Sequence, residues 1–585
     1  MDLGRVTLCM TFIAKQTYHK HEVTTWSVPN HWDILAIAII FAVIVLVAIG
    51  AKQMAAAYHL GDAMLIHLDP SYLPVYALRT TMRLFVALFL SLIFTFIVGS
   101  WAAKNHRAEQ LIIPTVDILQ SVPVLSFLTI TASGFILLFK NSMLGPECAA
   151  IFGIFTAQVW NMILSFYQSI KTIPKEIKEV ASIFQLSPWQ RFWRVEVPYS
   201  MSGLLWNMMM SMSGSWFFVI ACEAFSVSGS SITLPGVGSY IWLAIMQADR
   251  TAIVYAITCM LIVIFLYDQL LFRPLLYWTE QFREQIGDEE KIPRVWLVTL
   301  FQKTKLIRSI IDWFSKISDA LINLKILNRK KFIHSNNKFL SIYARLGYLI
   351  LTTLIISLSL AICLRLLINL SVKEAKDVFI LGLFTGTRVM ILIFISSLIW
   401  LPIGVWIGLR PHVSAIIQPI IQFVAAFPAN LLFPIATMLI MRFNLNAEIW
   451  VAPLMVLCTQ WYILFNVIAG TSQLPKELKL AADNFKVKGW LWWKRFILPG
   501  IAPSFITGAI TAAGGAWNAS IVAEVITWGQ TKLTATWIGA YIKINSESGD
   551  FLRVALGTVV MCIIVLLINR LFWKPLYDMA MDKIN

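Results

Sequence analysis

The sequence predicts an all-α polytopic membrane protein with about 12 transmembrane helices, arranged as two parallel six-helix repeats. Three observations predict this class. The 585 residues are 58% hydrophobic and only 13% charged, whereas soluble globular chains carry about 25% charged residues. Uncharged runs long enough to span a bilayer recur along the chain. One polar nonapeptide, IPKEIKEVA (173–181), returns as LPKELKLAA (474–482) at an offset of 301 residues.

The elements follow one another in four expected segments. A mostly polar cytoplasmic arm covers residues 1–32, and a basic cytoplasmic linker covers residues 273–345. The first six-helix unit, 33–272, has spans near 33–52, 79–103, 111–140, 149–170, 200–224 and 251–272. The second unit, 346–585, has spans near 346–368, 381–409, 413–442, 448–470, 500–526 and 551–573. The first apolar run starts too far from the N-terminus for a cleaved signal peptide, so we expect a retained first span.

The two units are copies of one another. Residues that are costly to replace stay in step: Arg83 with Arg388 and Pro123 with Pro428 at an offset of 305, then Pro198 with Pro499, Trp216 with Trp517 and Glu223 with Glu524 at an offset of 301. A match of this length indicates an internal duplication. Because six spans is an even number, both copies enter the membrane in the same orientation and form a parallel repeat.

Charge predicts the topology. With both termini in the cytoplasm, the nonapeptide loops and the linker all face the cytoplasm, and the linker alone holds 14 Lys and Arg against 7 Asp and Glu. The opposite loops carry few cations, as the positive-inside rule requires. The net charge of +16 therefore reflects membrane topology, and we expect no nucleic-acid partner.

The linker contains LIRSIIDWFSKISDALINLKIL, which has apolar residues at helical spacing and a basic face. It is expected either to lie on the lipids of the inner leaflet or to pack on the cytoplasmic ends of the bundle. The seven cysteines show no spacing typical of disulfides or of a zinc site, and no metal is expected.

Each nonapeptide opens a cytoplasmic loop of polar and then aromatic and basic sequence. Pro174 and Pro475 suit a helix start, and the acids Glu176, Glu179 and Glu477 suit the N-terminal end of a helix. We expect a short helix with an exposed step of small residues (Ala181, Ala481, Ala482), then a bend, then an aromatic helix that re-enters the membrane. Small residues would let the surface of a partner approach closely.

The two loops resemble the EAA loop of permease subunits of bacterial ABC importers. That pattern is Glu-Ala-Ala, three residues, Gly, nine residues and Ile-x-Leu-Pro. The first copy reads Glu179-Val180-Ala181, then Gln185 in the glycine position, and ends at Pro198. The second reads Leu480-Ala481-Ala482, then Lys486 in the glycine position, and ends at Pro499. The phrases IPKEIKEVA and LPGVGSYI look most like the nitrate, sulfonate and taurine branch.

The resemblance implies a coupling helix in each loop, seated on one of two cytoplasmic ATPase subunits, and an extracytoplasmic solute-binding protein. ATP and Mg²⁺ would bind those partners, since this chain has no phosphate-binding loop of the form G-x-x-x-x-G-K-[ST] and is expected to need no cofactor and to be no enzyme itself. It also implies the bacterial inner membrane and a small anion or organic acid as solute. A glycine permits φ > 0, so Gln185 and Lys486 suggest a different bend at those two positions.

Six residues are candidates for the solute pathway: Pro123, Trp216, Glu223, Pro428, Trp517 and Glu524. Ionisable groups in or near the membrane are often functional, but the two glutamates also suit helix ends bonded to backbone. The tryptophans suit helix packing against small residues, and the prolines are also common in ordinary membrane helices.

Two other functions stay open from the sequence. An ion-coupled secondary transporter with two parallel six-helix halves would need buried carboxylates for its coupling ion, and the spans contain few. A membrane scaffold would need only the two docking loops, not the duplicated six-span unit.

Overall fold

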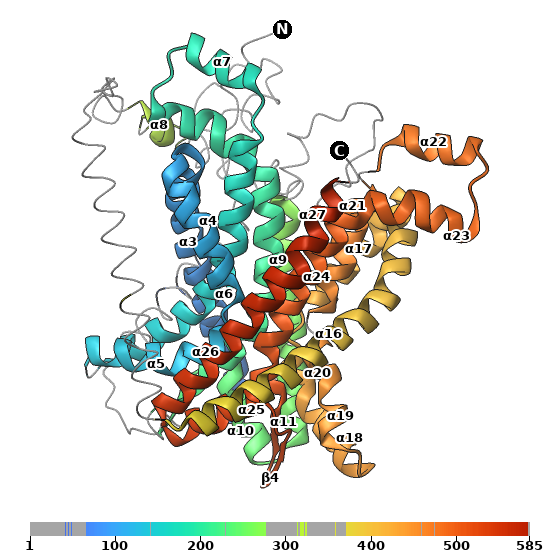
Figure 1. Cartoon of the computed structure of the whole chain (residues 1–585). Helices are drawn as coiled ribbons and strands as arrows, with labels where there is room; N and C mark the ends of the chain where they lie inside the picture. The colour runs from blue at the N-terminus through green and yellow to red at the C-terminus, as the bar shows by residue number, and fades with distance from the viewer. Residues whose placement is uncertain are drawn as a thin grey trace.

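The computed structural model describes residues 66–140, 142–227, 230–275, 370–457, 459–472 and 474–582, with isolated residues 41, 45, 48, 313, 316–320, 322, 323 and 357. Over these residues the chain is a bundle of long apolar helices with two short hairpins (Figure 1), which confirms the predicted all-α polytopic class. The predicted spans near 33–52 and 346–368, the N-terminal arm and most of the linker lie outside the described residues.

The described elements of the first half are η2 (Pro70–Tyr72), α3 (Leu73–Lys104), α4 (His106–Ser121), α5 (Val124–Leu138), α6 (Leu144–Lys171), α7 (Lys175–Ile183), α8 (Pro188–Arg191), η3 (Phe192–Glu196), α9 (Val197–Glu223), β1 (Ala224–Val227), β2 (Ser230–Thr233), α10 (Val237–Met246), α11 (Arg250–Tyr267) and η4 (Asp268–Phe272). Polar side chains set several boundaries: Asn105 accepts from the backbone N–H groups of Arg107 and Ala108 at the start of α4, and Asp249 does the same for Thr251 and Ala252 at the start of α11.

The described elements of the second half are α16 (Val372–Gly408), α17 (Pro411–Ala426), η5 (Ala429–Leu432), α18 (Phe433–Arg442), α19 (Ala447–Trp450), α20 (Ala452–Leu457), α21 (Gln460–Ser472), α22 (Lys476–Asn484), α23 (Gly489–Trp492), η6 (Trp493–Ile497), α24 (Leu498–Ala523), β3 (Val525–Trp528), β4 (Thr531–Thr534), α25 (Ile538–Ser548), α26 (Phe551–Ile568), η7 (Asn569–Trp573) and α27 (Lys574–Asp582). The duplication is visible in fine detail. Both hairpins, β1–β2 and β3–β4, are antiparallel. The π-helical turns η3 and η6 occupy equivalent positions, as do η4 and η7.

Seven described helical runs are long and apolar enough to cross a membrane: Pro70–Lys104, Leu144–Lys171, Gly203–Glu223, Arg250–Leu275, Val372–Gly408, Gly489–Ala523 and Phe551–Ala580. Two bent pairs, Pro411–Ala426 with Ala429–Arg442 at 67° and Ala447–Leu457 with Gln460–Ser472 at 41°, raise the number to nine if each pair is one span. The protein is therefore a multi-pass membrane protein, and twelve spans stays a prediction.

Proline breaks the third predicted span of each half. Pro123 is the N-cap of α5 and separates it from α4, and Pro428 is the N-cap of η5 and separates α17 from α18. A proline has no N–H to donate and disfavours helical conformation in the residue before it, so the chain turns at both points.

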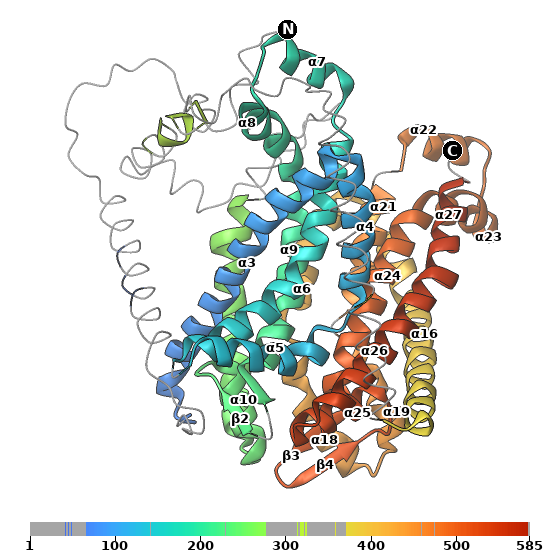
Figure 2. The same ribbon diagram turned by 60° about the vertical axis from the view of Figure 1, so that its left-hand side comes forward.

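Each broken span is held by the fifth span of the other half. The amide N–H of Val124, at the start of α5, donates to Oδ1 of Asn518 on α24 at 2.6 Å. The side-chain amide of Asn430 in η5 donates to the backbone carbonyl of Phe217 on α9 at 3.2 Å. These bonds join residues about 390 and 210 positions apart in the chain and lock the two halves together, side by side in Figure 2.

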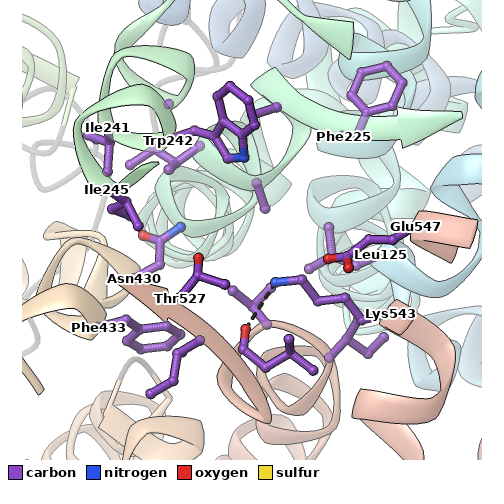
Figure 3. A pocket seen from close by; sticks show the side chains of 18 of the residues that line it. Leu125, Phe225, Ile241, Trp242, Ile245, Asn430, Phe433, Thr527, Lys543 and Glu547 are labelled. Carbon is purple, nitrogen blue, oxygen red and sulfur yellow. Dashed lines mark hydrogen bonds between the residues drawn. The ribbon is translucent and has the colours of Figure 1, made fainter. Parts of the chain in front are cut away.

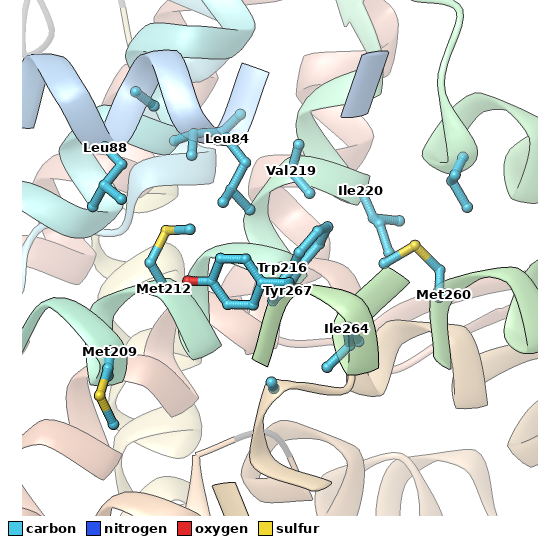
Figure 4. Close-up of a cluster of buried hydrophobic side chains, with 14 of the residues drawn as sticks. Leu84, Leu88, Met209, Met212, Trp216, Val219, Ile220, Met260, Ile264 and Tyr267 are labelled. Atoms are coloured by element: carbon cyan, nitrogen blue, oxygen red, sulfur yellow. The ribbon is translucent and has the colours of Figure 1, made fainter. Parts of the chain in front are cut away.

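Each half has its own core around its fifth span. Trp216 of α9 is fully buried among side chains of α3, α9 and α11 and meets Tyr267 edge-on at a ring distance of 5.9 Å (Figure 4). Its equivalent Trp517 lies in the core of the second half and packs against Gly386 of α16. A core on each side makes the halves separate packed units that meet along a seam.

Candidate functional site

Two equivalent loops project from one end of the bundle. Figures 1 and 2 show α7 and α8 in one loop and α22 and α23 in the other, at the end opposite the hairpins. Pro174 and Pro475 are the N-caps of α7 and α22. Glu176 and Glu477 lie exposed in the first helical turn, and Glu179 is also exposed. Negative charge at that end complements the helix dipole, so the predicted start of each loop helix matches the structure.

The predicted different bend at the glycine position is wrong. Gln185 and Lys486 take φ values of 48° and 51°, the left-handed conformation that a glycine would take. Both turns close in the same way: the N–H of Leu186 donates to the carbonyl of Ala181 at 3.2 Å, and that of Val487 to the carbonyl of Ala482 at 3.0 Å. This six-to-one bond defines a Schellman turn, so hydrogen bonding keeps the bend without the glycine.

The predicted exposed alanine step is wrong for two of its three members. Ala181 is 4% and Ala482 is 8% exposed, because the turn that follows each helix folds back over them; Ala481 is half-buried. The exposed apolar surface of the loops comes instead from larger side chains, with exposed fractions of 75% at Ile183, 53% at Phe184, 63% at Leu480 and 82% at Phe485. These four residues are called the loop patch below. Large apolar side chains projecting from a polar loop mark a protein interaction surface.

Different forces attach the two loops to the bundle. Pro198 and Pro499 stand in the first turns of α9 and α24, just after the π-helical turns. Next to Pro198, buried Glu196 binds Lys104 at 2.6 Å and Arg191 at 3.3 Å. The equivalent of Glu196 in the second half is the fully buried Ile497. The first loop is thus anchored by ion pairs and the second by apolar packing.

One residue of the linker meets the first loop. The side-chain oxygen of Asn323 accepts from the Gln190 amide at 3.2 Å and from the Arg194 guanidinium at 3.3 Å. Asn323 therefore lies at the end of the bundle that carries the loops. Whether its predicted amphipathic helix lies on lipid or on the bundle stays a prediction.

A cavity of about 260 Å³ lies between the halves at the hairpin end of the bundle (Figure 3). It is lined by equivalent elements of the two copies: α5, α9, the first hairpin and α10 from one side, and η5, α18, α24, the second hairpin and α25 from the other. Among the described residues, no group of three or more His, Cys, Asp or Glu side chains is placed to hold a metal ion.

None of the six candidate pathway residues lines this cavity. Trp216 and Trp517 are buried in the two cores. Pro123 and Pro428 are buried at the breaks of the third spans, one turn or less before the lining residues Leu125 and Asn430. A role of the six residues in a solute pathway stays a prediction, and it would not be a direct contact with a solute in this cavity.

Glu223 and Glu524 fix the hairpin end of each half instead. Glu223 is fully buried and accepts from Thr80 and Arg83 at 2.6 Å each and from the Gly238 N–H at 2.6 Å. Glu524 is also fully buried and accepts from the Ala540 N–H at 2.9 Å. These carboxylates tie the ends of α9 and α24 to the starts of α10 and α25. The glutamates thus lie at helix ends bonded to backbone, beside the cavity wall.

The sequence interpretation missed the polar lining of the cavity, above all Lys543, Asn430 and Thr527. A signal for Lys543 was present in the duplication. The phrase GSYIWLAIM of the first copy is matched by GAYIKINSE in the second, where Trp242, Ile245 and Met246 become Lys543, Ser546 and Glu547. Within one short helix the repeat keeps its register but changes from apolar to polar at three cavity-lining positions, which indicates that the two copies of this helix have different tasks.

Comparison with known proteins identifies the repeated unit. Residues 95–273 and 400–574 each match the family of the binding-protein-dependent transport system inner membrane component. The chain is 27% identical over 151 residues to a bicarbonate transport system permease protein of Synechococcus elongatus, covering 26% of this chain and 53% of the relative. It is 26% identical over 148 residues to a nitrate import permease protein of Leptolyngbya laminosa, covering 25% and 48%.

A third relative is the taurine transport system permease protein of Escherichia coli, 27% identical over 188 residues, covering 31% of this chain and 63% of the relative. The chain spans about half the length of the curated relatives it matches. The two family matches overlap one predicted six-helix unit each and together cover more than half of the chain. The chain therefore belongs to the family of inner membrane components of binding-protein-dependent transport systems, and it carries the family domain twice.

Proposed function

We propose that this chain is the complete membrane part of an ATP-driven importer, with both permease halves in one polypeptide, and that it forms a path for a small anionic solute across the bacterial inner membrane. The observation that carries the proposal is the pair of equivalent loops at one end of the bundle, each with a Schellman turn and exposed members of the loop patch. Two matching surfaces at one end call for two copies of a partner.

Each loop would seat on one cytoplasmic ATPase subunit, which would bind ATP and Mg²⁺ and carry out the hydrolysis. Ile183 and Phe184 in one loop, and Leu480 and Phe485 in the other, would enter an apolar groove of the ATPase, since buried large apolar residues supply most of the affinity of such contacts. Glu176, Glu179 and Glu477 would meet cations at the rim of that groove. Movement of the two ATPases toward each other would then move α9 and α24 through the rigid turns at Pro198 and Pro499.

The hairpin end would face outward and receive the solute from an extracytoplasmic binding protein. This orientation would put the loops and the C-terminal helix α27 in the cytoplasm, the side on which the distribution of Lys and Arg also predicts both termini. The names of the relatives mention bicarbonate, nitrate and taurine, each of which carries an anionic group. The ion-coupled alternative is not favoured, because the matching family belongs to binding-protein-dependent transport.

The test is purification of the tagged chain from its native membrane, followed by identification of the subunits that accompany it. An ATPase subunit should accompany the wild-type chain and be lost or reduced with Glu176→Lys and Glu477→Lys. Asp377→Lys is the matched control, because Asp377 is an exposed acid near the start of α16, at the end away from the loops. A wild-type chain that comes out alone, from a membrane that retains other ATP-driven importers, would contradict the proposal.

A further inference from the structure

The cavity between the halves has two chemically different walls. Equivalent positions face it in pairs, and the first-half member of four pairs is apolar where the second-half member is polar. The pairs are Leu125 with Asn430, Trp242 with Lys543, Ile245 with Ser546 and Met246 with Glu547. Phe225, Leu128 and Ile220 extend the apolar wall, where Thr233 is the polar exception. Thr527 and Thr437 add polar groups to the second-half wall, called the polar wall because it carries the charged side chains; its other lining residues are apolar: Phe433, Pro434, Ile521, Val522, Val525, Ile526 and Ile542. A duplicated unit has thus become asymmetric where its copies meet.

Lys543 is the cation of the polar wall. Its ammonium group donates to the backbone carbonyl of Val525 at 3.1 Å (Figure 3). Among the described residues no carboxylate lies within ion-pair distance of it; Glu547, which acts on it from a greater distance, is paired with Lys532 at 2.7 Å. Burial lowers the pKa of Lys543, because removal from water disfavours the charged form. An anion in the cavity would offset that cost.

The volume and the lining of the cavity further restrict which ligands would fit. A volume of about 260 Å³ is roughly that of eight or nine liquid water molecules, which exceeds the need of a single small inorganic ion. A small inorganic anion would fill only part of that volume and would leave the apolar wall of Leu125, Phe225 and Trp242 in contact with water. A short organic anion would place its charged group at Lys543 and its hydrocarbon part against that wall.

We infer that this cavity is a solute-binding site for a short aliphatic organic anion, such as an alkylsulfonate, whose charged group binds Lys543 with help from Asn430, Thr527 and Ser546. The inference rests on the proposed import function and deepens it by naming the substrate class. It assigns the first half of the chain to recognition of the hydrocarbon part and the second half to recognition of the charge.

The experiment measures binding to the purified full chain in nanodiscs, through the thermal stabilisation that a ligand of the folded state produces. The probes are sodium methanesulfonate, ethanesulfonate and butanesulfonate, compared with sodium nitrate at the same ionic strength. We expect ethanesulfonate to stabilise the chain, with affinity rising about fourfold per added methylene group, and nitrate to stabilise it far less. Equal stabilisation by nitrate and butanesulfonate, or none by any sulfonate, would overturn the inference.

Variants locate the site. Lys543→Met should weaken ethanesulfonate binding about tenfold or more, because it removes a charge-assisted hydrogen bond. Lys376→Met is the matched control, since Lys376 is an exposed lysine of α16 that does not line the cavity, and it should leave the affinity nearly unchanged. If Lys543→Met does not fold, Thr527→Val, which removes a hydroxyl from the polar wall, should weaken every sulfonate, and Trp242→Ala should remove most of the gain per methylene. Unchanged binding in the folded variants would overturn the inference.

This assay needs no ATPase, so its outcome is separable from that of the purification described above. Copurification of an ATPase with sulfonate binding that is indifferent to Lys543 would leave the import function standing and reject the site. Sulfonate binding lost with Lys543→Met, in a chain that recruits no ATPase, would support the site and reject the ATP-driven mechanism.

Discussion

Replacement of Arg83 should cost more stability than replacement of its equivalent Arg388. Arg83 is fully buried on α3 and joins two buried carboxylates: its guanidinium donates to Glu147 at 2.5 and 2.8 Å and to Glu223 at 2.6 Å. Arg388 has a partly exposed side chain, reaches the Glu448 carbonyl at 2.7 Å but its carboxylate only at 3.5 Å, and lies 4.1 Å from the Trp537 ring centre.

The magnitudes follow from these contacts. Arg83→Met leaves buried Glu223 without its cation and leaves Glu147 with Arg79 alone, at 3.5 Å, and breaking a buried ion pair costs about 3–5 kcal/mol. Arg388→Met removes one hydrogen bond to a carbonyl, about 0.5–1.5 kcal/mol, and one cation–π contact, about 0.5–2 kcal/mol. The Glu524 carboxylate accepts a hydrogen bond from the backbone N–H of Ala540. Arg388 forms its ion pair with Glu448 and not with Glu524. The first variant should therefore lose about twice as much stability as the second.

The assay is unfolding of the purified chain in mixed micelles, followed by tryptophan fluorescence, for both variants. Arg83→Met combined with Glu223→Gln is the decisive companion, because the neutral amide leaves no charge buried at position 223 while Glu147 keeps Arg79 as its cation. It should be more stable than Arg83→Met alone. Equal losses for the two arginine variants, or a double variant less stable than the single one, would refute the idea that a buried charge network holds the hairpin end of the first half.

Three further outcomes follow from other contacts. Lys486→Gly should stabilise the second loop by about 1 kcal/mol, because a side chain in the left-handed region is strained; slower proteolysis of the loop would report the gain, and faster proteolysis would contradict the assigned turn. Asn518→Leu should cost about 1–3 kcal/mol by leaving the buried Val124 N–H unpaired, measured as a lower unfolding midpoint; an unchanged midpoint would show that this bond does not join the halves. The pKa of Glu109 is lowered from 4.5 to about 2 by hydrogen bonds from Lys171 and then Tyr167. Its stabilising effect is therefore present above about pH 4.5 and lost as the pH falls toward 2; wild type should exceed Glu109→Gln in unfolding midpoint at neutral pH, and the two should converge in acid, whereas a constant difference would be contrary to the assignment.

The duplication made much of the fold predictable. Alignment of the two copies showed which residues recur at equivalent positions. Pro174 and Pro475 could therefore be recognised as paired helix starts, and Pro123 and Pro428 as paired breaks. Periodicity and length then located the long spans, because a bilayer imposes both. Local signals of this kind act within a few turns of helix and are readable from one sequence.

The conformation of the loop turns could not be derived in the same way. The absence of glycine at Gln185 and Lys486 predicted another bend, yet the Schellman hydrogen bonds retain it. A glycine makes the left-handed conformation easy, but it is not required where hydrogen bonds and the following helix over-determine the turn.

The cavity was out of reach of local patterns for a different reason. Its walls meet across the seam between halves, so Trp242 and Lys543 lie opposite each other only after both copies have folded and docked. The same is true of the bond between Val124 and Asn518. Register within a copy can be read from the sequence, whereas the way in which one copy faces the other is set by tertiary packing.

The most direct test of the central claim is the number of ATPase subunits bound to one chain. Native mass spectrometry of the complex purified in mild detergent should give two ATPases for wild type, one for Ile183→Asp and one for Phe485→Asp, and none for the double variant. These substitutions place a charge in the loop patch on the surface of the protein, so they leave the cores intact. A wild-type chain with a single ATPase, or a double variant that still binds two, would contradict the account in which each copy of the loop holds one ATPase.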